Sequence, residues 1–305
     1  MHGFIAGLLI AGISLSTPFL LAALGELFAE RAGVINVGIE GMVLVGAFCG
    51  FAASYFSHSA WIGALGAAAG GIVFAGLFAL VAVGFKADQV VAGTAVNILA
   101  LGVTGVFNRA LFAQAGSSAT AFSSIDIPLL DRIPYLGPAL FTQNALGYLG
   151  WLAVPAAYWY LYRTKPGLRL RAVGEYPAAA ESAGVPVNRT RVFAVLFAGA
   201  LAGLAGAYLS IGYTNAFIEN MSKGYGFIAL AVVILGRWNP VGTLLAALLF
   251  GIASALQSQL SVLKIPLPYQ VFQALPYIIT LATLMFRAAG RAGGPAALGR
   301  PHERA

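Results

Sequence analysis

Nine apolar runs, separated by short polar stretches, set the pattern of this chain. About 20 mostly apolar residues are needed to cross a bilayer as a helix, so each run predicts a membrane segment. The runs cover residues 4–24, 34–56, 61–84, 90–112, 146–162, 192–213, 225–236, 241–260 and 269–286. The pattern predicts an all-α fold: a polytopic transmembrane helical bundle of about eight or nine apolar segments within residues 1–286.

Two stretches need a separate interpretation. The run at 225–236 is short for a crossing, which favours a broken or re-entrant piece packed inside the bundle and leaves eight or nine crossings open. The sequence GELFAERAG, residues 25–33, follows the first run and carries three charges. It predicts a polar turn between the first two crossings.

The composition strengthens the membrane prediction. Only 9% of the 305 residues are charged, against about 25% in soluble domains, and the mean hydropathy is +0.86. The net charge of +7 does not indicate nucleic-acid binding, because the basic residues lie in short loops between apolar runs. Such loops are typical of the cytoplasmic side of a membrane protein.

The basic residues also predict the orientation. Six of the 17 Lys and Arg lie between Arg163 and Arg191, so residues 163–191 are expected to form a cytoplasmic loop. Nine crossings then place the N-terminus outside and residues 113–145 in an ordered external loop with a short surface helix. The Gly/Ala/Pro/Arg-rich residues 287–305 predict a disordered cytoplasmic tail.

Several kinds of chemistry are missing from the sequence. A phosphate-binding P-loop needs Gly-Lys followed by Ser or Thr, and the four lysines precede Ala87, Pro166, Gly224 and Ile265. The single cysteine, Cys49, lies in an apolar run, and the three histidines lie far apart. These features predict that the chain is not an enzyme and has no metal site or cofactor of its own.

Asn36, Glu40 and Asn97 are polar residues inside apolar runs, and we expect them to border a translocation pathway. Asn36 and Glu40 are four positions apart among interrupting glycines, the pattern of a broken helix that lines a cavity. An alternative is helix packing, with Glu40 paired to a neighbour and Asn97 bonded between helices. The mostly uncharged polar set suits a polar, uncharged solute better than ion coupling.

The loop at 163–191 contains a second candidate site. Pro166-Gly167 predicts a break after the preceding crossing. Pro177 suits a first helical position, AAAESA favours helix, and Gly184 ends it, so we expect a helix at 177–183. Glu175, Ala179 and Gly184 are the expected docking element for a partner protein. The alternative is a plain basic loop.

Four stretches carry a resemblance to a known family. ALGELFAERAGVINVGIEGMVLVGAF, ADQVVAGTAVNILALGVTGVFNR, GYGFIALAVVILGRWNPVGTLLAALLFG and GLRLRAVGEYPAAAESAGV resemble permease subunits of ABC importers. The similarity lies in the branch that handles branched-chain amino acids, ribose-like sugars and nucleosides, and is strongest to the nucleoside type. It covers roughly residues 15–286.

The resemblance implies an assembly in the bacterial plasma (inner) membrane. Its other members would be a cytoplasmic ATPase, which uses the ATP, a second permease subunit, paralogous or identical, and an extracytoplasmic solute-binding protein. The expected function is ATP-driven import of nucleosides by alternating access. An importer of simple sugars or another small polar solute is one alternative, and an ion-coupled secondary transporter is another.

Overall fold

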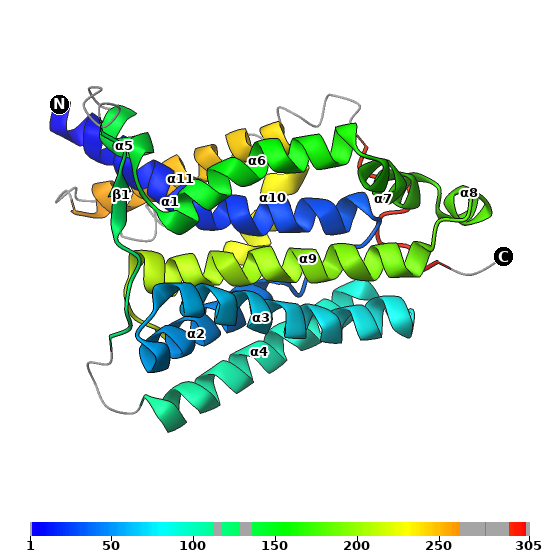
Figure 1. Cartoon of the computed structure of the whole chain (residues 1–305), viewed down its shortest axis with the longest axis horizontal. Helices are drawn as coiled ribbons and strands as arrows, with labels where there is room; N and C mark the ends of the chain where they lie inside the picture. The colour runs from blue at the N-terminus through cyan, green and yellow to red at the C-terminus, as the bar shows by residue number, and fades with distance from the viewer. Residues whose placement is uncertain (1, 113–117, 129–135, 263–277, 279–292, 303–305) are drawn as a thin grey trace.

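A long helical bundle forms the body of the protein (Figure 1). The structure is a computed structural model that describes residues 2–112, 118–128, 136–262, 278 and 293–302. The main helices are α1 (His2–Arg31), α2 (Ile39–Ser57), α3 (Ala60–Ala79), α4 (Gln89–Leu111), α6 (Ala145–Arg163), α9 (Val187–Ala207), α10 (Tyr225–Leu235) and α11 (Pro240–Val262). The π-helical turns η1 (Leu80–Gly84) and η2 (Tyr208–Tyr213) extend α3 and α9.

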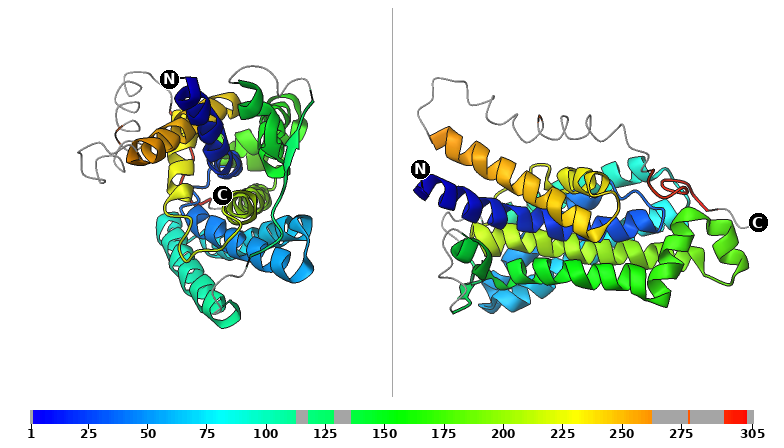
Figure 2. Two further views of the ribbon diagram at one scale, coloured as in Figure 1. Left: turned by 90° about the vertical axis from the view of Figure 1, so that its left-hand side faces the viewer. Right: turned by 90° about the horizontal axis from the view of Figure 1, so that it is seen from above.

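Helices α1 and α9 form the centre of the bundle. Helix α9 contacts α1, α2 and α3, whereas α1 also contacts α6, α10 and α11. A view along the bundle shows α9 between α1 and the α2–α3 pair, with α4 at the outer edge (Figure 2). The core between these helices is almost entirely Ala, Val, Leu, Ile and Phe.

The two ends of the bundle differ. At one end the strands β1 (Ser124–Asp126) and β2 (Thr142–Asn144) pair antiparallel, with Ser124 opposite Asn144, and α5 (Leu136–Phe141) lies before β2. The opposite end carries two short helices, α7 (Lys165–Glu175) and α8 (Pro177–Ser182) (Figure 1). We call these the sheet end and the α8 end.

The prediction of a helical, multi-pass membrane protein is confirmed. Among the described residues, six helices are long and apolar enough to cross a membrane. The predicted run 146–162 is helix α6, which is not one of the six, and 225–236 is the 11-residue helix α10, too short to cross. The run 269–286 lies outside the described residues except for Ile278, so the count of eight or nine is not confirmed.

The predicted turn at residues 25–33 is wrong, because α1 continues without interruption to Arg31. The two carboxylates of α1, Glu26 and Glu30, are buried but hydrogen-bonded. Glu26 accepts a hydrogen bond from the backbone of Asn36 at 2.9 Å, and Glu30 accepts one from the indole of Trp238. These bonds let the helix carry two acidic residues into the bundle.

Glycines allow the central helices to touch backbone to backbone. A Cβ added to Gly71 of α3 would lie 2.1 Å from the carbonyl oxygen of Gly199 in α9, and one added to Gly46 of α2 would lie 2.4 Å from the Cα of Gly203. Small residues at such positions are the usual means of close helix packing in membranes. The α2–α3–α9 contact therefore depends on these four glycines.

We expect Gly71→Val to separate α3 from α9, because its side chain would overlap backbone that cannot rotate away. Overpacking of this kind costs about 1–3 kcal/mol or more, so the purified variant should melt at a lower temperature in detergent. Gly102→Val is the matched control: Gly102 lies in α4 with no atom within 4 Å of its added Cβ. Equal melting temperatures for both variants would contradict the packing argument.

Candidate translocation site

Two non-helical segments enter the bundle from opposite ends. Residues 32–38 follow the end of α1 at the α8 end, and residues 214–224 follow η2 at the sheet end. Each leads into a helix that begins inside the bundle: α2 at Ile39 and α10 at Tyr225. Irregular backbone at membrane depth is tolerated only where protein or a cavity satisfies its polar groups, so the partners of these segments define the site.

Glu40 joins the two helix starts. It lies in the first turn of α2, and its carboxylate accepts hydrogen bonds from the backbone N–H of Gly224 at 2.8 Å and of Gly226 at 2.7 Å. A carboxylate at a helix N-terminus satisfies free N–H groups and interacts favourably with the helix dipole. Glu40 is 9% exposed, so a single buried side chain belongs to α2 and caps α10.

Asn97 braces the same place from α4. Its Oδ1 accepts a hydrogen bond from the backbone N–H of Gly41 at 2.8 Å, and its Nδ2 donates one to the carbonyl of Val37 at 3.0 Å. One amide thus satisfies backbone groups on both sides of the point where α2 begins. The interhelical bonding considered for Asn97 from the sequence is present.

Asn36 lies deeper in the 32–38 segment. Its backbone N–H donates to Glu26, and its side-chain amide contacts the sulfur of Met42 at 3.4 Å. Within the described residues its Oδ1 has no hydrogen-bond partner. Asn36 is fully buried and does not line the cavity described next, so the structure separates it from Glu40 and Asn97.

A cavity of about 320 Å³ opens beside Glu40 and Asn97, between α2, α4 and residues 220–227. Its apolar part comes from Leu44, Ile98, Leu101 and Phe227, and its polar part from Glu40, Thr94, Asn97, Asn220, Ser222 and Lys223. Small-molecule sites commonly have this size and combine apolar walls with a few placed polar groups. The arrangement can bind a small, partly polar molecule.

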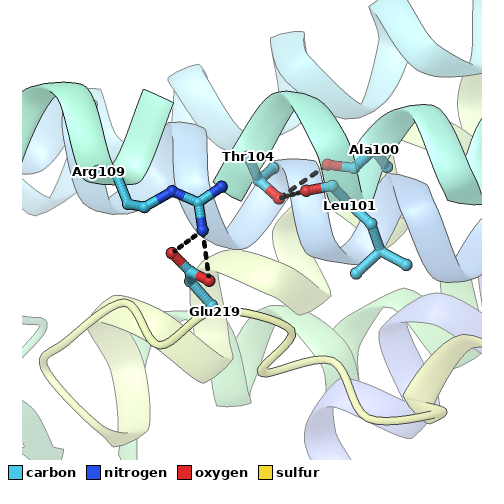
Figure 3. A network of polar contacts seen from close by, with 5 residues as sticks. All are labelled: Ala100, Leu101, Thr104, Arg109 and Glu219. Carbon is cyan, nitrogen blue, oxygen red and sulfur yellow. Dashed lines mark hydrogen bonds and ion pairs between the residues drawn. The ribbon is translucent and has the colours of Figure 1, made fainter. Parts of the chain in front are cut away.

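An ion pair lies on the sheet-end side of the cavity (Figure 3). Arg109, near the end of α4, lies 3.4 Å from Glu219, which belongs to the segment leading into α10. Both side chains are largely exposed, so the pair is worth only about 0.2–1 kcal/mol. The pair connects α4 with the segment that leads into α10 (Figure 3), and breaking it costs little.

A second buried polar cluster, at the α8 end, was missed from the sequence. The indole of Trp238 donates to Glu30, and the Arg31 guanidinium donates to the Trp238 carbonyl at 2.8 Å. Arg191 of α9 donates to the carbonyl of Ala32 at 3.2 Å. The cluster fastens the ends of α1 and α10 to α9, and the four-residue spacing of Glu26 and Glu30 was its one signal in the sequence.

The predicted helix in the loop at 163–191 is present as α8, Pro177–Ser182. It ends where Gly184 adopts a φ of +79°, and the backbone N–H of Gly184 donates to the carbonyl of Glu181 at 2.8 Å. Ala180 packs inward against Val173 and Val187, whereas Ala179 is exposed. Helix α8 therefore presents exposed small side chains, among them Ala179, and lies at the end of the bundle (Figure 1).

Helix α7 was not predicted. Instead of a simple break at Pro166-Gly167, the Thr164 side chain accepts a hydrogen bond from the backbone N–H of Gly167 at 3.1 Å and starts a new helix. Pro166 suits its first turn because proline needs no N–H partner there. Helix α7 packs against α6 and supports α8.

Of the tail predicted to be disordered at 287–305, residues 293–302 instead pack against the α8 end, and the other residues lie outside the described part of the chain. The backbone N–H of Ala296 donates to Glu175 at 3.2 Å, and His302 lies 2.9 Å from Glu181. The N–H of Gly299 donates to the carbonyl of Gly33 at 3.1 Å. Small residues let this segment lie close to α7, α8 and the 32–38 segment at once.

Known proteins resemble this chain over most of its length. A guanosine ABC transporter permease protein of Bacillus subtilis is 37% identical over 300 residues, covering 94% of this chain and 93% of that protein. A nucleoside ABC transporter permease protein of Lactococcus lactis is 36% identical, covering 88% of each chain. A putative glucose ABC transporter permease protein of Haloferax volcanii is 36% identical, covering 93% and 92%.

No solved structure matches the chain significantly. The sequence profile of one family, described as the branched-chain amino acid transport system / permease component, matches residues 8–286. That range contains both non-helical segments, Glu40, Asn97, α7 and α8. The chain therefore belongs to the branched-chain amino acid transport system / permease component family.

Proposed function

We propose that this protein is the membrane-spanning permease subunit of an ATP-driven ABC importer for nucleosides. The observation that carries the proposal is the cavity at Glu40 and Asn97, where two helices begin inside the bundle beside a lining that combines apolar walls with mostly uncharged polar groups. Discontinuous helices at membrane depth are a common way to build a solute site in transporters. The nucleoside and guanosine permeases among its relatives support the choice of solute.

The working cycle assigned here is alternating access. A cytoplasmic ATPase would dock on α8 and the residues that flank it, through Glu175, Ala179 and Gly184. A second permease subunit would complete the pathway. An extracytoplasmic solute-binding protein would deliver the solute at the sheet end, with the complex in the bacterial inner membrane. Motion of α8 would pass to the cavity through the tail segment 293–302, which contacts both α8 and the 32–38 segment.

Glucose import is the second candidate, because one relative is a putative glucose permease. A cavity with apolar walls favours a nucleoside, whose flat base can lie against Phe227 or Leu44 while its ribose bonds to polar groups. A sugar has little apolar surface to bury in the same place.

Ion coupling is disfavoured by the bonding of Glu40. Proton- and ion-coupled transporters place exchangeable carboxylates in their pathways. Among the described lining residues Glu40 is the one carboxylate, and both of its oxygens accept backbone hydrogen bonds that cap α10. Protonating it would weaken the start of that helix.

Uptake by the complete transporter tests the solute. We expect unlabelled guanosine, adenosine or uridine to compete with radiolabelled nucleoside in proteoliposomes that contain ATP, while a thousandfold excess of glucose does not. Uptake of radiolabelled glucose without uptake of radiolabelled nucleoside would instead assign the importer to sugars. Uptake that continues without the ATPase and stops when the proton gradient is removed would replace the importer with a secondary transporter.

Ala179→Arg tests the docking role of α8. The substitution places a long charged side chain on the exposed small face, so ATPase copurification and uptake should fall at least tenfold while membrane insertion stays normal. Phe85→Arg is the control, since Phe85 is 75% exposed in the connection that precedes α4, outside α7 and α8. Normal uptake by the Ala179 variant would contradict the assignment.

Asn97→Ala tests the cavity. Removing its amide leaves the Val37 carbonyl and the Gly41 N–H unpaired, at a cost of about 1–3 kcal/mol for each buried group. We expect a lower melting temperature and a higher KM for uptake per correctly folded complex. Asn108→Ala, three turns further along α4 and outside the cavity lining, should change neither. Unchanged uptake kinetics in an Asn36/Glu40/Asn97 triple alanine variant would remove these residues from the pathway.

A further inference from the structure

An apolar groove runs along the outside of the bundle, far from the translocation cavity. It has a volume of about 310 Å³ and is lined by residues of α6, α9 and α1; Figure 1 shows how these three helices lie side by side. Phe28 of α1 forms the floor, with its ring 5.5 Å from that of Tyr160 and 4.7 Å from that of Phe197. Since this face belongs to a membrane-spanning bundle, we expect the groove to open toward lipid.

The groove continues into a second hollow of about 240 Å³ at the α8 end. Tyr160 and Phe193 line both, so the two spaces are adjacent along α6 and α9. The second hollow is lined by two arginines, Arg169 of α7 and Arg189 of α9, and no Asp or Glu is among its described lining residues. In the described part of the chain neither arginine is in an ion pair.

The dimensions of the combined site match one leaflet of a bilayer. Arg189 and Leu201 mark its two ends on α9. At 1.5 Å per residue they are about 18 Å apart, close to half of the ~30 Å hydrocarbon core. The basic end lies where α7 leaves the bundle, and Trp159, 62% exposed, lies on the rim, as expected near a headgroup region.

We propose that this groove is a binding site for an anionic phospholipid. Its acyl chain would lie against Phe28 and Phe197, and its phosphate would bind Arg169 and Arg189. Guanidinium groups bind phosphate through paired, charge-assisted hydrogen bonds, and basic pockets between membrane helices recognise anionic headgroups. A bound lipid would contact α6, α7 and α9, and so would sit beside the α8 element whatever solute the protein carries.

The test is lipid binding to the full-length protein, measured by native mass spectrometry in detergent. Phosphatidylglycerol should bind more tightly than phosphatidylcholine with the same acyl chains. The double variant Arg169→Gln/Arg189→Gln should weaken the binding of phosphatidylglycerol about fivefold per arginine. Its binding of phosphatidylcholine should stay unchanged. The matched control, Arg163→Gln/Lys165→Gln, removes two exposed charges from the same end outside the hollow and should have no effect.

A second variant probes the apolar part. Ala156 is exposed and lines the groove, so Ala156→Trp can fill it without disturbing the core and should weaken binding of both lipids. Equal binding of the two lipids, or equal losses in the arginine pair and its control, would overturn the proposal. Competition by water-soluble glycerol phosphate at the same concentration as the lipid would instead show a soluble-phosphate site.

The other occupant to be tested is a second permease subunit. Cys49 is the one cysteine of the chain, so Cys49→Ser/Ala156→Cys carries a single thiol in the groove. We expect it to react with a maleimide attached to a lipid and to give no crosslinked permease dimer in membranes. Efficient crosslinking between two permease chains through residue 156 would assign the groove to subunit contact and overturn the lipid site.

Discussion

The arrangement of this protein depends on one constraint: backbone N–H and C=O groups inside a bilayer need partners from the protein itself. Residues 32–38 and the buried end of the 214–224 segment are not helical and would leave such groups unpaired. Glu40 and Asn97 satisfy backbone groups of these regions with four hydrogen bonds, two from each side chain. The same two side chains border the cavity, so the groups that make the broken helices possible also shape the space between them.

Helix α10 links the cavity to the α8 end of the bundle. Helix α10 begins at the Glu40 carboxylate and ends near Trp238, whose indole and carbonyl bond to Glu30 and Arg31. Its 11 residues cover about 16 Å. A rigid half-helix held at both ends by buried polar groups transmits displacement better than a loop of the same length.

Much of this could be predicted from the sequence, because apolar run length and residue spacing report helices directly. The runs 34–56, 61–84 and 90–112 correspond to helices, and α8 has its proline start and glycine stop. The helical extension to Arg31 was not predictable in this way. Glu26 and Glu30 look like turn residues until their partners Asn36 and Trp238, one of them 208 positions away, are known. Residues 293–302 were missed for the same reason: small residues without a periodic pattern show order only through distant contacts.

The packing of residues 293–302 also bears on how the protein is made. Translation runs from the N-terminus, so the membrane helices and α8 emerge long before Ala296, Gly299 and His302. Glu175, Glu181 and the carbonyl of Gly33 receive these contacts only when residues 293–302 have left the ribosome. The α8 end is therefore completed by residues made after every membrane helix described here, and a chain cut before residue 293 would carry those helices yet lack the finished surface at that end.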